Sequence, residues 1–456
     1  MNPEEQQANL KIAVACVLSS EPTVRKTISL HVPGWENLGE IVVVTIPDHW
    51  RTVSPEVSKR MEKAVPKSSG FVQILVLDKL KYTACFGVED EDLRQLIPIA
   101  SLDEFRKKLP RFLQGVGLDW LTFTERRLSK WRHGVVDKRR ITLWLNQFAR
   151  AGSNEWIGEG LLRALDFWTE ERLISSVDLT QEILEAFARV CLHRQQSGKS
   201  ADVLANLFAK QIKPLAPKFG GIEDFYTALS TSDATTNDQS ILFLEDGIFS
   251  GTEMIKLLSD LLGLEVPDGR IRKAPALVDK ALITSRKITL LFPVATSFGV
   301  SRLQSFLQEN NLSKIEVVHS APGFLDVLSL AGSEALVNGT FFDTTIRNCP
   351  ADPDCHFIHL PFENQTVWKT SDHAAHALAF CKEIGSQLFQ NYLKDVGREW
   401  PATKIKRSAL GMYGIGLTFA FSHSIPKATL PLFWAGGKVQ FEGKTLNWVP
   451  LFPNAA

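Results

Sequence analysis

The sequence has no excess of charge of either sign, because 51 lysine and arginine residues balance 51 aspartate and glutamate residues. A chain without net charge has no overall field that draws it to nucleic acid or to an anionic membrane, although local basic patches can still bind. It also has no apolar run near the ~18 residues that a membrane-spanning helix needs. Its first residues, MNPEEQQANLK, do not resemble a secretory signal. We therefore expect a cytoplasmic protein without a membrane partner.

Cysteine is scarce, and the six cysteines form no CxxC pair and no dense framework. Scattered thiols of this kind favour reduced cysteines in a cytosol over a disulfide scaffold. Cys349 and Cys355 lie close to His356 and His359 in the chain, but five residues separate the two cysteines. Structural zinc sites use cysteine spacings of about two to four residues. We therefore predict no metal site built from protein ligands alone.

Apolar residues make up 44% of the 456 residues, which is enough for more than one hydrophobic core. Strand-like runs separated by turn residues fill most of residues 11–88, and one of them is TISLHV at 27–32. Strand and helix patterns alternate after residue 240, which predicts an α/β fold with a mostly parallel sheet. The expected domains are a separate, strand-rich α+β module at 1–120, a basic connector at 121–140, a helical region at 141–230 that caps the sheet, and an α/β core with a C-terminal wrap at 231–456.

Residues 126–140 combine seven lysine and arginine residues with Trp131 and His133. Basic side chains interleaved with an aromatic ring can bind a phosphate backbone and stack a base, so nucleic acid is one candidate partner of this segment. The same pattern is typical of a solvated helix or linker. Both interpretations are open at this point.

The stretch from Ser240 to Leu258 carries the clearest chemical signal. Four apolar residues run into Glu245 and Asp246, and a short turn, Ser250-Gly251-Thr252, then leads into an apolar pattern of helical spacing. This order predicts a buried strand, a tight polar turn and a helix start. The helix N-terminus favours a phosphate, and the two carboxylates could hold the vicinal hydroxyls of a ribose. The alternative is an ordinary buried strand and capped helix without a ligand.

Two further loops are candidate contacts. Gly198, Lys199 and Ser200 form a possible pyrophosphate loop; they are not a Walker A motif, because His193 stands where that motif needs glycine. A solvated turn is the alternative there. Thr296, Ser297 and Gly299 follow the next predicted strand, whose carboxyl end opens onto the same edge of the sheet as Glu245 and Asp246. Plain turn chemistry would explain these three equally well.

The acidic pair and the turn behind it resemble the phosphoribosyl pyrophosphate (PRPP) motif of type I phosphoribosyltransferases. The resemblance implies that Glu245 and Asp246 contact the ribose and that the loop Ser250, Gly251, Thr252 and Glu253 holds the 5-phosphate. Glu253 departs from that family's pattern, which places another threonine or a small residue there.

A second resemblance lies in the C-terminal residues FSHSIPKATLPLFW and NWVPLFP and in the WLNQF pattern of Trp144, Gln147 and Phe148. These are similar to a phosphoribosyltransferase-like family found in prokaryotic conflict systems, and the similarity covers about residues 141–456. It implies a phosphoribosyltransferase-like sheet and a role in antiphage defence.

The two resemblances together imply a protein that binds PRPP or a nucleotide with Mg²⁺ and transfers or cleaves a ribosyl-phosphate group. The alternative is a catalytically inactive nucleotide sensor or scaffold that binds a protein or nucleic-acid partner. A protein partner from the same defence system would bind through the N-terminal module.

Overall fold

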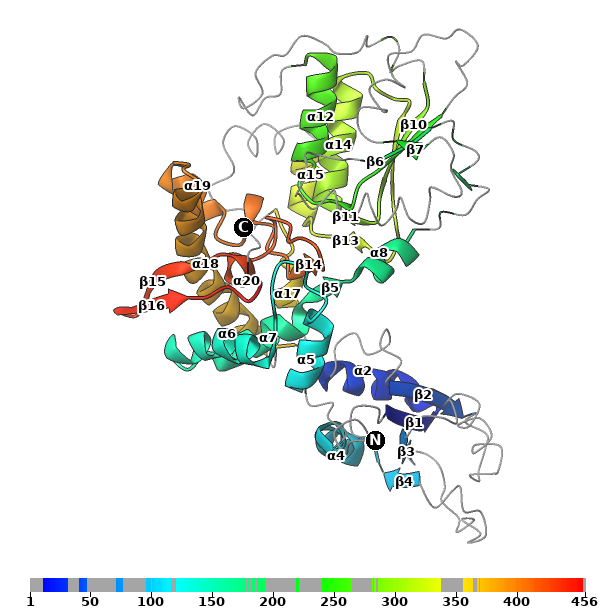
Figure 1. The fold of residues 1–456 in the computed structure, drawn as a ribbon, viewed down its shortest axis with the longest axis vertical. Coiled ribbons are helices and arrows are strands. Elements are labelled where there is room, and N and C mark those ends of the chain that lie inside the picture. Colours follow the sequence, from blue (N-terminus) through cyan, green and yellow to red (C-terminus); the bar gives the residue numbers. More distant parts are fainter. Residues whose placement is uncertain are drawn as a thin grey trace. The chain divides into compact units, whose positions relative to one another are not determined.

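The computed structural model describes residues 11–31, 41–46, 71–76, 96–99, 101–115, 120–177, 189–192, 219–220, 240–264, 286–337, 356–363 and 370–453, together with a few isolated residues between these ranges. The chain divides into two compact units. The N-terminal unit contains Met1–Ser129, Asp137–Ile141 and Leu162–Ala164, and the C-terminal unit contains the rest of the chain. Figure 1 shows the elements of both units.

The N-terminal unit is built on a four-stranded sheet in the order β2-β1-β3-β4. The strands are β1 (Lys11–Val17), β2 (Ile41–Ile46), β3 (Phe71–Val76) and β4 (Leu96–Ile99). All described pairs in this sheet are parallel. The unit therefore combines a parallel sheet with helices, where the sequence predicts a strand-rich module of mixed α and β structure.

The described helices of the N-terminal unit follow its first and last strands. After the 3-10 turn η1 (Leu18–Ser20), α2 (Glu21–His31) follows β1, and α4 (Leu102–Gly115) and α5 (Trp120–Leu128) follow β4. The strand predicted at 27–32 is therefore wrong. Val24 and Ile28 lie four residues apart on one helical face and are fully buried, so burial overrides the β-propensity of the branched side chains.

The core of the C-terminal unit is a five-stranded parallel sheet in the order β12-β10-β8-β6-β7. Its strands are β6 (Arg189–Leu192), β7 (Phe219–Gly220), β8 (Ile241–Leu244), β10 (Ile288–Phe292) and β12 (Ile315–His319). The predicted α/β class with a mostly parallel sheet is confirmed. Two of these strands lie inside 141–230, which the sequence analysis expected to be helical. A short apolar run such as RVCL cannot be distinguished from a buried helical turn by its periodicity.

Apolar clusters cover both faces of this sheet, which explains why β8 is apolar at every position. Ile241 and Phe243 pack in one cluster with residues of α12 (Thr252–Leu262) and α14 (Ser297–Glu309). Figure 1 shows these two helices side by side on that face, with α15 (Leu330–Val337) nearby. Leu242 and Leu244 pack in the second cluster, which includes residues of α8 (Glu170–Ser175) and of the C-terminal segment.

The segment before the core and the end of the chain form one structure. Strand β5 (Asp166–Trp168) pairs in parallel with β14 (Phe419–Phe421), although more than two hundred residues separate them in the chain. Helix α6 (Lys138–Arg150) carries the WLNQF pattern, and the indole of Trp144 donates a hydrogen bond to the carbonyl of Leu432 at 2.8 Å. Gln147 exchanges hydrogen bonds with the backbone of Val449. Both parts of the family-like pattern therefore lie in the same core.

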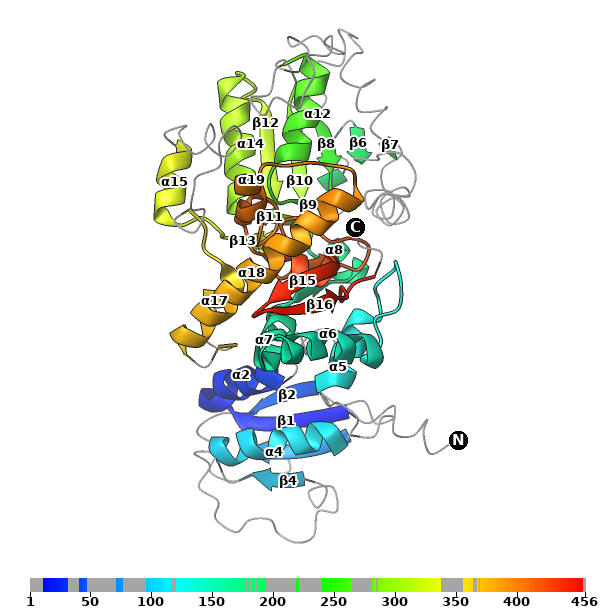
Figure 2. The same ribbon diagram turned by 90° about the vertical axis from the view of Figure 1, so that its left-hand side faces the viewer.

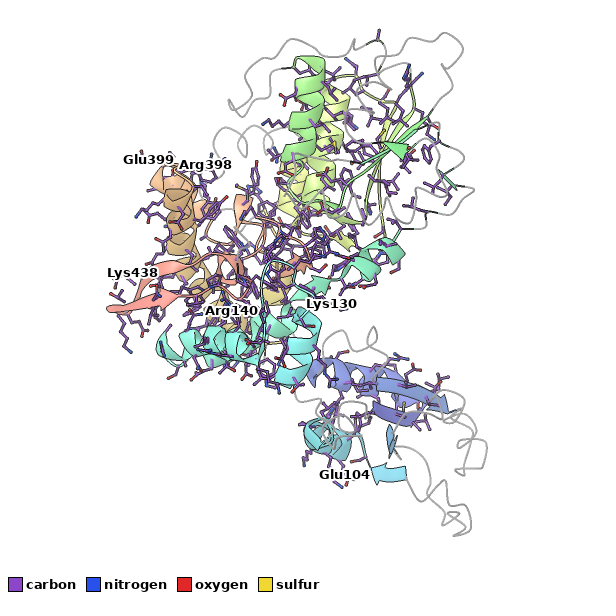
Figure 3. The ribbon with its side chains drawn as sticks, in the orientation of Figure 1. Glu104, Lys130, Arg140, Arg398, Glu399 and Lys438 are labelled. Atoms are coloured by element: carbon purple, nitrogen blue, oxygen red, sulfur yellow. The ribbon has the colours of Figure 1, made fainter. Side chains whose placement is uncertain are left out.

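Further elements complete this part of the unit. They are α7 (Glu155–Ala164), α17 (Leu360–Glu363), α18 (Ser371–Asp395), α19 (Ala402–Arg407), the 3-10 turn η5 (Met412–Gly414), α20 (Pro431–Trp434) and the antiparallel hairpin of β15 (Gly437–Phe441) and β16 (Lys444–Trp448). Helix α18 runs along the hairpin (Figure 2). The side chain of Asn391 donates to the carbonyl of Lys438, which Figure 3 labels, at 3.0 Å.

The basic segment at 126–140 joins the end of α5 to the start of α6. Trp131 is 4% exposed, its indole donates to the carbonyl of Pro453 at 3.1 Å, and its ring contacts Phe452. Arg132 forms an ion pair with Glu170. The ring of Trp131 therefore cannot stack on a base, and that part of the nucleic-acid interpretation is wrong. None of the described helices is both long enough and apolar enough to cross a membrane.

Lys427 gives the C-terminal unit an expected pH dependence. Its ammonium lies 4.1 Å from the ring centroid of Trp434, and burial lowers the pKa of Lys427 to about 8. The unfolded chain then binds more protons than the folded protein between pH 8 and the ordinary lysine pKa of 10.5, so the free energy of unfolding rises with pH in that range. We expect Lys427 to contribute a rise of about 1 kcal/mol between pH 8 and 9, which chemical denaturation measures as the difference between the wild type and a variant without this lysine.

A Lys427→Met variant serves as the control and should lose this rise. Burial raises the pKa of Cys16 to about 12 and also raises that of Cys381, so the folded protein keeps thiol protons that the unfolded chain releases. These thiols lower stability already between pH 8 and 9, because the ordinary thiol pKa of 9.0 lies at the end of that range, but they do so equally in both proteins, so the contribution of Lys427 is the difference between the two slopes. Equal slopes for the wild type and the variant would contradict the prediction.

Candidate functional site

The acidic pair lies at a break in a strand. β8 ends at Leu244, Glu245 and Asp246 follow, and the chain resumes a ladder as β9 (Gly247–Ile248). The amide of Glu245 donates to the carbonyl of Leu291 at 3.2 Å, and the carbonyl of Asp246 accepts from the amide of Val294 at 3.3 Å. Backbone hydrogen bonds thus hold the pair on both sides, while its side chains are half-buried and that of Asp246 is 15% exposed.

The neighbouring strands break at the same level. Beyond β10 and β12, the chain continues as β11 (Val294–Thr296) and β13 (Phe324–Leu325), which pair with β9 in the order β13-β11-β9. The hydroxyl of Ser320 donates to the carbonyl of Pro293 at 2.5 Å across this break. The acidic pair therefore lies directly beyond the carboxyl end of β8, where the sequence placed it, and a second short ladder continues past it.

The turn behind the pair has the predicted order of strand, turn and helix, and this prediction is confirmed. Gly251 is the N-cap of α12 and has a φ of +73°, a conformation that favours glycine. The hydroxyl of Ser250 donates to that of Thr252 at 3.2 Å. Glu253 is exposed in the first turn of the helix, so its carboxylate lies away from the packed side of the loop. Near a bound anion, this exposure would leave the charge of Glu253 screened by water.

Thr296 and Gly299 hold the loop from the side of α14. Thr296 is fully buried, and its hydroxyl donates to the carbonyl of Phe249 at 2.5 Å and accepts from the amide of Gly299 at 3.0 Å. A Cβ on Gly299 would lie 2.8 Å from the carbonyl oxygen of Phe249. The hydroxyl of Ser297 accepts from the amides of Val327 and Leu328. In this arrangement Thr296 and Gly299 position the loop, and Ser297 fixes the chain after β13.

Gly198, Lys199 and Ser200 lie outside the described residues. The order of the strands in the core sheet shows where the chain stands just before this segment, at the end of β6. Strand β6 ends at Leu192, which pairs with Leu244, the residue before the acidic pair. The strand order reverses between β6 and β8, and ligands of open α/β sheets bind at such a switch point. The chain that leads to the possible pyrophosphate loop therefore leaves the sheet beside the acidic pair.

Arg302 joins the site from α14 and is not among the site residues predicted from the sequence. Its side chain is 1% exposed, and its Nη1 donates to the carbonyl of Ser250 at 2.5 Å and to the hydroxyl of Thr252 at 3.2 Å. The available sequence signal was an arginine on the buried face of an apolar helix, one turn after Phe298. A buried guanidinium beneath the loop adds a positive charge to the N-terminus of α12.

Tyr413 reaches the same loop from the C-terminal segment. Its hydroxyl lies 2.7 Å from the Thr252 hydroxyl, and its ring packs against Arg302, with 5.0 Å from the guanidinium carbon to the ring centroid. Tyr413 has a φ of +64°, between glycines that also have positive φ, which is uncommon for a bulky residue. Strained backbone of this kind clusters at ligand sites. The glycine-rich residues GMYGIG are the signal that sequence reasoning missed.

His423 reaches the acidic pair itself. Its Nε2 lies 3.2 Å from Oδ2 of Asp246, across 177 residues of chain, and its side chain is 1% exposed. The residue belongs to the FSHSIP part of the C-terminal pattern. The C-terminal segment therefore contributes side chains both to the loop and to the carboxylates.

Comparison with known proteins assigns the family. The family model PRTase-CE matches residues 141–454, a range that includes the core sheet, the acidic pair, the loop, Arg302, Tyr413 and His423. Neither the curated proteins nor the solved structures include a match to the chain. Since the model matches well over half of the sequence, the chain belongs to the PRTase-CE family and is a phosphoribosyltransferase-like protein.

Proposed function

We propose that the acidic pair and the Ser250–Thr252 loop bind PRPP or a nucleotide, and that the protein transfers or cleaves a ribosyl-phosphate group. The observation that carries the proposal is the buried guanidinium of Arg302 directly beneath the loop at the N-terminus of α12. A helix N-terminus favours an anion, and a cation held beneath the loop adds to the field that attracts a phosphate there. Membership of a phosphoribosyltransferase-like family supports the same ligand class.

The proposed roles follow from the chemistry of each group. Glu245 and Asp246 accept hydrogen bonds from the ribose hydroxyls, and the amides of the first turn of α12, which have no acceptor within the helix, donate to the 5-phosphate. Positive charge develops on the ribosyl ring as its bond to the leaving group breaks, and the nearby carboxylates stabilise that charge. Because Glu253 is exposed, its carboxylate does not oppose the phosphate at close range.

The proposal includes Mg²⁺ as a partner of the ligand. Among the described residues, no three acidic, histidine or cysteine side chains gather in a way that could hold a metal ion. Mg²⁺ often binds through one or two carboxylates plus substrate phosphates, and Glu245 and Asp246 fit that donor set. When bound, the ion would neutralise charge on a departing pyrophosphate.

The proposed biological role is antiphage defence, with a protein partner bound by the N-terminal unit. Its support is the resemblance of the C-terminal pattern to a family of conflict systems, together with an N-terminal unit whose sheet precedes the matched range. Phage plaque counts on cells that carry the wild type or Asp246→Asn test this role. Equal protection by both would separate any defence role from the candidate site.

Asp246→Asn tests the binding site. The amide keeps the shape of the side chain but removes its charge and replaces one acceptor oxygen with a donor. Charged hydrogen bonds contribute about 1.5–3 kcal/mol, so we expect PRPP affinity to fall by about tenfold to a hundredfold in calorimetry. Glu253→Gln is the matched control on the exposed side of the loop and should change affinity less than about threefold. Unchanged affinity in Asp246→Asn would rule out this site.

A second candidate function is a nucleotide sensor or scaffold without catalysis. The specific observation is that the hydroxyl of Thr252 already contacts that of Tyr413. A ligand phosphate that binds the Thr252 hydroxyl would replace Tyr413 there and so move the C-terminal segment. Incubation with PRPP and a panel of bases separates the two functions. Pyrophosphate release supports the transferase, and measurable binding without release supports the sensor.

A nucleic-acid partner of the scaffold would have to bind through the exposed basic side chains of residues 126–140, without stacking on Trp131. A salt-sensitive shift of labelled DNA or RNA would reveal it.

A further inference from the structure

A buried histidine on the acidic pair has no part in the function proposed above. His423 follows β14, and three contacts fix it. Its Nε2 lies 3.2 Å from Oδ2 of Asp246, its ring stacks on Phe421 with an interplanar angle of 15°, and its carbonyl is 2.7 Å from Nε2 of His133. Both the ring and the backbone of His423 are therefore held in place.

The hydrogen bonds of the ring indicate which nitrogen carries the proton. Nδ1 of His423 is buried, and no partner reaches it from the part of the chain that the structure describes. A neutral imidazole has one N–H donor and one acceptor nitrogen. A proton on Nδ1 would leave a buried N–H without an acceptor and would turn the lone pair of Nε2 toward the carboxylate of Asp246. The favourable tautomer therefore has its proton on Nε2, which donates to Asp246.

This bond matters because of where Asp246 lies. Its carboxylate follows that of Glu245 directly in the chain, and only 15% of its side chain is exposed. Two neighbouring negative charges repel each other, and a donor on one of them offsets part of that repulsion. The donor also fixes the rotation of the carboxylate, because Oδ2 faces His423 and no donor from the described part of the chain occupies Oδ1.

We infer that His423 is a positioning residue for Asp246, which it holds as an oriented carboxylate so that Oδ1 can accept a ribose hydroxyl of the bound sugar phosphate. The inference rests on the proposed function and deepens it, because it assigns a site role to a residue of the C-terminal segment. It also explains a buried histidine whose Nε2 is directed at a carboxylate.

Two substitutions of equal length test the inference. In His423→Gln the side-chain amide can still donate to Asp246, whereas His423→Met has a similar shape and no donor. We expect PRPP affinity, measured by calorimetry, to fall at least about tenfold in His423→Met and to stay within about threefold of the wild type in His423→Gln. Chemical denaturation of both variants shows whether the difference in affinity follows a difference in stability. If His423→Met does not fold, His423→Leu takes its place against His423→Gln.

A double variant tests whether His423 acts through Asp246. If it does, His423→Met should weaken binding little in a protein that already carries Asp246→Asn, because the carboxylate to be positioned is absent. The same loss in both backgrounds, or equal affinity of His423→Met and the wild type, would overturn the inference and leave the proposed binding site standing. A wild-type protein that binds neither PRPP nor a nucleotide would overturn both.

Discussion

Replacing Arg302 by methionine is expected to weaken PRPP binding by at least about thirtyfold and to lower the free energy of unfolding by about 1–3 kcal/mol. The guanidinium donates to the carbonyl of Ser250 and to the hydroxyl of Thr252, so its loss removes charge-assisted donors from two loop acceptors. Methionine fills much of the same volume between Phe298 and Tyr413, which limits the loss of packing. Calorimetry gives the affinity, and chemical denaturation gives the stability.

A phosphate site is identified by a loss of PRPP affinity in Arg302→Met that exceeds the loss of stability. Replacing buried charged groups by apolar residues of similar volume is often close to neutral for stability, so a purely structural arginine would give a modest loss of stability and no specific loss of binding. Arg302→Lys is the matched control, because it keeps the charge but loses the planar set of guanidinium donors. Its PRPP affinity should lie between those of the wild type and Arg302→Met. PRPP affinity of Arg302→Met equal to that of the wild type would remove the buried cation from the proposed site.

Gly299→Ala is expected to destabilise the protein by about 1–3 kcal/mol and to weaken ligand binding, although the same substitution in an ordinary helix is stabilising. A Cβ on Gly299 would lie 2.8 Å from the carbonyl oxygen of Phe249 and 3.0 Å from that of Ile248, both in the segment that leads into the loop. A Cβ on Gly251 would in turn lie 2.9 Å from the carbonyl oxygen of Gly299. The two glycines therefore let the N-termini of α12 and α14 approach each other closely.

The direction of the stability change in Gly299→Ala distinguishes a close helix contact from an ordinary helical glycine. A glycine in α14 without a close neighbour would gain about 0.5–1 kcal/mol of stability on becoming alanine, since the unfolded chain loses conformational freedom. Gln304→Ala, on the exposed side of α14, is the control and should leave both stability and ligand binding nearly unchanged. Thermal and chemical denaturation measure stability, and calorimetry measures binding. A more stable Gly299→Ala protein with full affinity would show that the close approach of the two helices is not needed.

The strand, turn and helix start at residues 241–258 could be predicted from the sequence, because short-range patterns specify them. An apolar run of four residues, an acidic pair and a glycine-containing turn specify strand, turn and helix start within a few residues, and the structure has them in that order. The break that holds Glu245 and Asp246 was not predictable, because β9 has only two residues and exists through its pairing with β11. A strand of that length has no sequence signature of its own.

The rest of the candidate site depends on tertiary packing. Arg302, Tyr413 and His423 lie 50 to 177 residues from their partners in the loop and the acidic pair. No short-range pattern brings such residues together. Trp131 shows the opposite error: its basic neighbours suggested a surface ring, but its apolar body is buried against Phe452.

The pairing of β5 with β14 has a consequence for synthesis of the chain on the ribosome. All five core strands leave the ribosome after β5 and before β14, so one apolar face of the sheet stays uncovered until Phe419 and Phe421 have been synthesised. Long-range pairing of this kind forms late and leaves apolar surface open to aggregation until it does. A nascent chain stopped before residue 419 would lack that cover as well as His423, so a premature stop codon should yield an aggregation-prone product without a complete ligand site.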